Sequence, residues 1–172
     1  MREYWYEATF LLETLVMKAR GQDRNGMDLS FTSGPVTVQN EHRESAFVKA
    51  MKDSRAQPSP GMQTDMRDEL GNILSVYLDG VKGRRYHSPN DLKNLTIIVL
   101  TDGLWKGMSE ENGVDQKISS FVTSLTKIIG DLRFRPVSIE FIQFGRDLGA
   151  TLRLQRLDDK LKPLVSPCKG AV

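Results

Sequence analysis

The segment Leu95–Gly103 constrains the fold of this chain more than any other part of its sequence. It begins with a continuous apolar run, rich in β-branched residues, and ends abruptly in Thr101-Asp102-Gly103. Such a run is typical of a strand buried on both faces of a parallel sheet. The Asp-Gly turn would then lie at the carboxyl end of the strand, where open α/β sheets bind their ligands. We therefore expect Asp102 to lie at a binding site.

Helix-like and strand-like segments alternate along the rest of the chain. Apolar residues at helical spacing predict helices over residues 4–20, 44–51, 65–81 and 114–129, and a final helix after Asp147. Alternating or apolar runs predict strands over residues 28–32, 36–38 and 136–145. This order predicts an α/β fold, with a Rossmann-like, mostly parallel sheet flanked by helices on both faces. We expect one domain over residues 1–160 and an irregular, proline-containing tail over residues 161–172.

Composition narrows the range of partners and compartments. The 24 Lys and Arg residues nearly balance the 22 Asp and Glu residues, so the charge does not predict a nucleic-acid partner. A single cysteine, Cys168, excludes an internal disulfide and suits a reducing compartment. The charged and aromatic first residues do not resemble a signal peptide, and no apolar run is long enough to cross a bilayer. We expect a cytoplasmic protein that binds neither nucleic acid nor membrane.

Thr64 and Asp102 are the pair most suited to binding a metal ion. Thr64 lies just before a predicted helix, Asp102 follows the predicted strand, and both can lie along one rim of the sheet. Hydroxyl and carboxylate oxygens are the ligands that hard cations such as Mg²⁺ and Mn²⁺ prefer. Each residue also has a purely structural interpretation: Thr64 can cap the helix, and Asp102 can close an Asp-Gly turn.

Other motifs point less clearly to chemistry. Ser124-Leu125-Thr126-Lys127 matches Ser-x-x-Lys, but it lies in an amphipathic helix and the companion motifs of the acyl-transferring enzymes are absent. His42 and His87 both lie in polar stretches, and the basic cluster at residues 82–87 fits a solvated loop. A metal-assisted hydrolase or transferase is the alternative from another functional class, although the sequence nominates no base or nucleophile near Asp102.

Two of these segments together resemble a known family. Thr101-Asp102-Gly103 after an apolar strand, with Gly61-Met62-Gln63-Thr64-Asp65 upstream, resembles the von Willebrand factor A domain. Residues 4–12 and 136–146 resemble its intracellular fungal-type members, and the resemblance covers about residues 1–160.

The resemblance implies a non-enzymatic protein–protein interaction module with a metal-ion-dependent adhesion site. Thr64 and Asp102 would hold Mg²⁺ or Mn²⁺, and a carboxylate of a partner protein would complete the coordination of the ion. Asp65, Gly103 and Leu104 would line or support the same rim. Trp105 would be a contact anchor there, or would instead pack against a neighbouring helix.

One motif of the family has no counterpart in this chain. The family carries Asp-x-Ser-x-Ser after its first strand, whereas here the first predicted helix begins near Met1. We therefore expect an N-terminally truncated domain whose first strand is missing and whose metal site is incomplete. Because Mg²⁺ takes about six oxygen ligands, two side chains would hold it weakly. An inert, truncated remnant is the remaining alternative.

Overall fold

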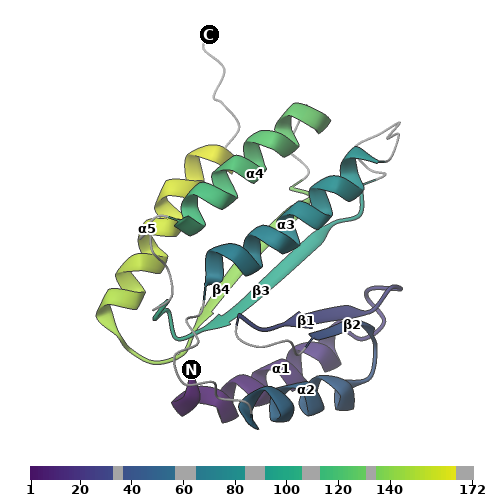
Figure 1. Ribbon diagram of the computed structural model, residues 1–172, viewed down its shortest axis with the longest axis vertical. Helices are drawn as coiled ribbons and strands as arrows, with labels where there is room; N and C mark the ends of the chain where they lie inside the picture. Colours follow the sequence, from purple (N-terminus) through teal and green to yellow (C-terminus); the bar gives the residue numbers. More distant parts are fainter. Residues whose placement is uncertain (33–36, 57–64, 84–91, 106–112, 131–134, 166–172) are drawn as a thin grey trace. The chain divides into compact units, whose positions relative to one another are not determined.

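The computed structural model describes residues 1–32, 37–56, 65–83, 92–105, 113–130 and 135–165, which form two compact units. The first unit contains the short 3-10 helix η1 (Arg2–Tyr4), α1 (Trp5–Ala19), β1 (Met27–Ser30), β2 (Thr37–Glu41) and α2 (Glu44–Ala56) (Figure 1). The second unit contains α3 (Met66–Lys82), β3 (Leu95–Thr101), α4 (Gly113–Ile129), β4 (Val137–Gln143) and α5 (Leu148–Val165).

The first unit is a two-stranded antiparallel sheet with two helices. Its strands pair Leu29 with Val38, and α1 packs against α2. Trp5 lies at this packing: its ring stacks on Phe31 with 6.0 Å between centroids, and its Nε1 donates a hydrogen bond of 3.1 Å to the carbonyl oxygen of Met51. The buried apolar side chains of the two helices are Ala8, Val16, Phe47, Ala50 and Met51.

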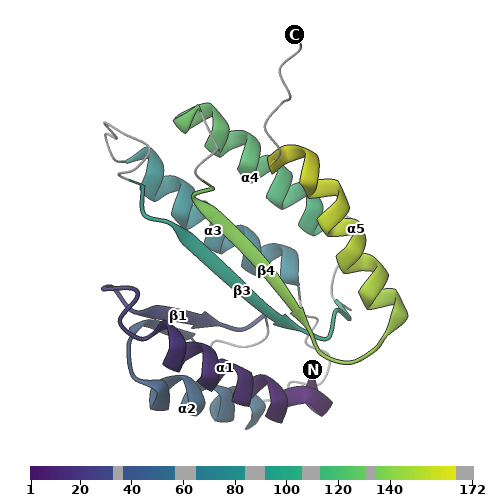
Figure 2. The same cartoon turned by 180° about the vertical axis from the view of Figure 1, so that it is seen from behind.

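The second unit is built around a small parallel sheet. β3 and β4 pair in register from Leu95 opposite Val137 to Thr101 opposite Gln143, with α4 as the crossover between them. α3 lies across one face of this sheet, in front of the strands in Figure 1 and behind them in Figure 2. α3 packs on α4, where the rings of Tyr77 and Phe121 lie 6.2 Å apart. The buried apolar side chains of this unit include Leu70, Leu74, Val99, Val114, Ile118 and Leu125.

The expectation that β3 is buried on both faces is wrong. Ile97, Val99 and Thr101 on one face are buried, but Thr96 and Ile98 on the other face are exposed. The alternation has a physical reason, because a sheet that packs helices on one face leaves the other face accessible to solvent. Only one face of β3 therefore contributes to the core of the unit.

The mixed α/β class and the parallel pairing expected from the sequence are confirmed, but a single continuous sheet is not. Within the described ranges the strands form two separate two-stranded sheets. α5 also continues to Val165, so the first residues of the tail expected to be irregular are helical.

Two of the residues considered in the sequence, His87 and Cys168, lie outside the described residues. Among the helices that are described, none combines the length and the apolar character needed to cross a membrane.

Candidate functional site

The candidate site lies at the carboxyl ends of β3 and β4, which end side by side. The last registered pair is Thr101 opposite Gln143, and the N–H of Phe144 donates a hydrogen bond of 2.8 Å to the carbonyl oxygen of Thr101. The chain then leaves β3 through Asp102, as expected, and leaves β4 toward the start of α5. Polar side chains from both strands and from α5 are therefore collected along one rim.

The turn after β3 is held by its own side chains. The N–H of Gly103 donates a hydrogen bond of 2.9 Å to Oγ1 of Thr101, which is buried. The N–H of Leu104 donates one of 3.0 Å to Oδ1 of Asp102, which is half-buried. An aspartate that accepts from the backbone two residues ahead forms an Asx-turn. Asp102 therefore has the turn-closing role that the sequence offered as its structural alternative.

α5 supports this turn from the other side. Gly103 adopts a positive φ of 72°, and a Cβ built on it would lie 2.5 Å from the Cβ of the buried Ala150. Arg153, three residues further along α5, donates a hydrogen bond from Nη1 to the carbonyl oxygen of Gly103. The turn is thus fixed at its backbone by two residues of a helix that is distant in sequence.

The start of α5 belongs to the same rim. Oδ1 of Asp147 accepts a hydrogen bond of 2.8 Å from the N–H of Ala150, so Asp147 caps the helix that the sequence predicts after it. Thr151 Oγ1 lies 2.9 Å from the carbonyl oxygen of Asp147 and 3.2 Å from Oε1 of Gln143. The side chain of Gln143 at the end of β4 is thereby tied to the first turn of α5.

Sequence reasoning did not identify Gln143, Thr151 or Arg153 as part of the rim. Gln143 is one of three polar residues in β4, with Ser138 and Glu140, and nothing local distinguishes it from the other two. Thr151 and Arg153 lie on an amphipathic helix, where threonine and arginine ordinarily face solvent. Their role depends on where α5 packs, which is a property of the tertiary structure.

Three of the residues predicted for the site, Asp102, Gly103 and Leu104, are consecutive and form the turn after β3. Leu104 is 39% exposed beside the Asp102 carboxylate, whereas Trp105 is only 8% exposed. Asp65 and Trp105 belong to the first unit, so their positions relative to Asp102 are not described. Thr64, the other predicted metal ligand, lies outside the described residues.

The described part of the rim does not by itself supply the ligands that Mg²⁺ requires. Oγ1 of Thr101 and Oδ1 of Asp102 both accept hydrogen bonds from the turn. No group of three or more His, Cys, Asp or Glu side chains that could hold a metal ion occurs among the described residues. Since Mg²⁺ takes about six oxygen ligands, this set is too small.

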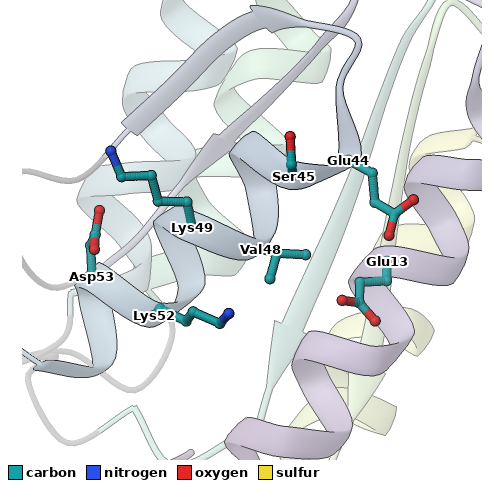
Figure 3. A pocket seen from close by; sticks show the side chains of 7 residues that line it. All are labelled: Glu13, Glu44, Ser45, Val48, Lys49, Lys52 and Asp53. Carbon is teal, nitrogen blue, oxygen red and sulfur yellow. The ribbon is translucent and has the colours of Figure 1, made fainter.

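A concave feature lies between α1 and α2 in the first unit (Figure 3). Its volume is about 500 Å³, and Figure 3 shows the carboxylates of Glu13 and Glu44 near each other on one side, with Lys52 projecting below Val48. The lining side chains are Glu13, Glu44, Ser45, Val48, Lys49, Lys52 and Asp53. A hollow of mostly charged side chains is typical of a solvated groove between helices, so we do not take it as a reaction site.

Comparisons with protein-family models, with curated proteins and with solved structures found no match to this chain. The family interpretation therefore depends on the motif resemblance, and the function on the geometry of the rim.

Proposed function

We propose that this chain is a non-enzymatic protein–protein interaction module of the von Willebrand factor A type, with a Rossmann-like arrangement of its sheet. Its contact surface is the turn formed by Asp102, Gly103 and Leu104. The observation that carries this proposal is the exposed Leu104 beside the Asp102 carboxylate, on a turn fixed by hydrogen bonds at the carboxyl end of β3.

A turn fixed in this way suits binding. Thr101 and Asp102 accept hydrogen bonds from within the turn, and Arg153 holds the Gly103 carbonyl from α5. A preformed loop loses little conformational entropy when a partner binds, so more of the contact energy appears as affinity. An apolar side chain surrounded by polar groups is also the usual composition of a contact patch.

The alternative function, a metal-assisted hydrolase or transferase, has less support. It needs a base or a nucleophile near Asp102. The hydroxyls of Thr101 and Thr151, which are the hydroxyls described along this rim, make hydrogen bonds to Gly103, Gln143 and Asp147. These bonds hold the turn and the helix start together, which is a structural role.

A divalent cation belongs to the proposal as a weakly held addition, with Thr64 and Asp102 as its ligands and a partner carboxylate completing the coordination. A ligand that binds only the folded state raises the melting midpoint by mass action. We expect Mg²⁺ or Mn²⁺ at about ten times its dissociation constant to stabilise the fold by about 1.4 kcal/mol. The shift should vanish in Asp102→Ala. If neither metal ion raises the melting midpoint, the chain would be a module that binds its partner without a metal ion.

Site-specific photo-crosslinking tests the proposed contact surface. A photoreactive amino acid is placed at Leu104, and in a matched control at Val76, an exposed apolar position on α3. In the cells that make the protein, we expect a discrete protein adduct from position 104 and none from position 76. The purified adduct partner should then bind Asp102→Asn and Leu104→Ser about tenfold more weakly than the unmodified chain. Equal adducts from both positions, or unchanged affinity, would contradict the proposal.

A further inference from the structure

α1 carries a row of large exposed apolar side chains that the core of its unit does not use. Tyr6, Phe10 and Met17 are 80%, 66% and 56% exposed. At about 100° per residue, these three positions fall within about 40° of one another around the helix. Ala8 and Val16, on other faces of the same helix, are buried. We call Tyr6, Phe10 and Met17 the α1 stripe.

The α1 stripe is long enough to be an interface, and Glu13, at about 340° from Tyr6, lies in the same sector between Phe10 and Met17. α1 has 15 residues, so it is about 22 Å long, and the stripe covers most of that length. Single exposed apolar residues are ordinary on protein surfaces, but an aligned row of them marks an interaction site. Aromatic residues and methionine are also the types enriched at interfaces.

The charges beside the stripe indicate what covers it. Glu7 in the first turn and Lys18 in the last turn of α1 are both exposed, and both lie on the same flank of the stripe, at about 100° and 120° from Tyr6. When two copies of a helix pack antiparallel, the same side of each helix lies along the same edge of the contact. The N-terminal end of one helix then lies beside the C-terminal end of the other. Each Glu7 would then lie near the partner's Lys18, at both ends of the contact.

The apolar side chains align best in a neighbouring register, because pairing Glu7 with Lys18 centres the contact between Leu12 and Glu13, a displacement of about 3 Å. Antiparallel packing centred between Leu11 and Leu12 places Tyr6 opposite the partner's Met17, so the aromatic ring meets a flexible thioether. It also places the partner's Phe10 opposite Glu13, at the edge of the hollow between α1 and α2 (Figure 3).

We propose that the α1 stripe is a self-association surface, through which two copies of this chain form an antiparallel α1–α1 dimer. We infer a second copy of the chain as the partner because α1 itself carries both Glu7 and Lys18, which antiparallel packing brings near each other. This inference concerns the first unit and does not depend on the function proposed for the rim of the second.

Sedimentation of the full chain over a micromolar concentration series tests the dimer. We expect a reversible monomer–dimer equilibrium whose dissociation constant rises by at least about tenfold in Phe10→Ser. Val76→Ser, which removes an exposed apolar side chain of α3, is the matched control and should leave the constant unchanged. Because both side chains are exposed, both variants should keep the far-ultraviolet circular dichroism of the original. A chain that stays monomeric, or a dimer that Phe10→Ser leaves intact, would overturn the proposal.

Charge reversal tests the orientation of the two helices. Glu7→Lys and Lys18→Glu should each weaken the dimer about threefold at low salt, because each creates like-charged pairs at both ends of the contact. Combined in one chain, the two substitutions restore both pairs and should restore the original dissociation constant. In a parallel pair like residues face each other, so neither single change would matter, and that result would overturn the antiparallel register.

Discussion

Gly103 is the residue on which the turn at the rim depends most, for two separate reasons. Its φ of 72° is strained for any residue with a side chain, and a Cβ would lie 2.5 Å from the Cβ of Ala150. Since Ala150 belongs to the packed face of α5, the clash cannot be relieved by rotating a flexible side chain.

We expect Gly103→Ala to lower the free energy of unfolding by about 2 to 5 kcal/mol, which combines backbone strain with overpacking. Gly130 provides a matched control: its φ is 76°, but no atom lies within 4 Å of the Cβ it would gain. Gly130→Ala should therefore show only the strain, about 1 to 2 kcal/mol. Urea denaturation measures both values, and equal losses in the two variants would show that the contact with Ala150 relaxes.

A surface ion pair in the first unit provides a prediction about pH. Arg43 lowers the pKa of the Glu41 carboxyl from 4.5 to about 2, chiefly through hydrogen bonds from its guanidinium, of which Nη2 to Oε2 is 3.0 Å. The N–H groups of His42 and Arg43 also donate to Oε1 of Glu41, each at 2.9 Å. The folded state therefore favours the ionised carboxylate, and this stabilisation is present above pH 4.5 and is lost as the pH falls toward 2.

We expect Arg43→Gln to raise the pKa of Glu41 toward, but not up to, its ordinary value, since the backbone donors remain. Titration of the Glu41 side-chain carbon by nuclear magnetic resonance measures this directly. An unchanged pKa in the variant would show that the backbone N–H groups alone hold the carboxylate ionised.

At the scale of elements, α5 depends on the side chain at its N-terminus. Asp147 accepts a hydrogen bond of 2.8 Å from the N–H of Ala150 at the first turn. We expect Asp147→Ala to lower the free energy of unfolding by about 1 kcal/mol, because that N–H loses its partner. Asp147→Asn keeps an acceptor at the same place and should lose much less. A thermal melt of the two variants separates them, and equal losses would indicate that the negative charge matters rather than the acceptor.

Most elements could be predicted from the sequence because their apolar residues follow the period of a helix or a strand. The spacing of Val114, Ile118, Phe121 and Leu125 predicts α4, and these four side chains are buried. The apolar run of β3 predicts a strand, but it does not reveal that one face stays accessible. An apolar side chain has the same identity whether or not another layer covers it.

The candidate site could be predicted in part for the same reason. Asp102 and Gly103 form a turn with a local signature, so their place at the end of β3 follows from the sequence. Arg153 binds the carbonyl of Gly103 from a helix fifty residues away in sequence, and no local pattern encodes that contact. A site residue whose contacts are with its sequence neighbours can be predicted from the sequence. A site residue whose contacts arise from tertiary packing cannot.

At the scale of the whole molecule, the described residues divide into two compact units, and no pattern in the sequence indicates where. Each unit has its own buried core, which includes Phe47 in α2 and Leu125 in α4. Regions whose contacts are mostly internal open as cooperative units of different stability. We therefore expect each unit to have its own free energy of opening, set by its own core.

Hydrogen exchange of the folded chain tests whether the two cores open separately. We expect Phe47→Ala to cost about 3 to 5 kcal/mol and to speed amide exchange in α1 and α2, while β3, β4 and α4 keep their protection. Leu125→Ala should cost about 2 to 5 kcal/mol and show the opposite pattern. If both variants accelerate all amides by the same factor, the chain unfolds as one cooperative domain. The exchange rates of amides are compared within each unit, so the pattern of protection reports the contacts inside that unit's core.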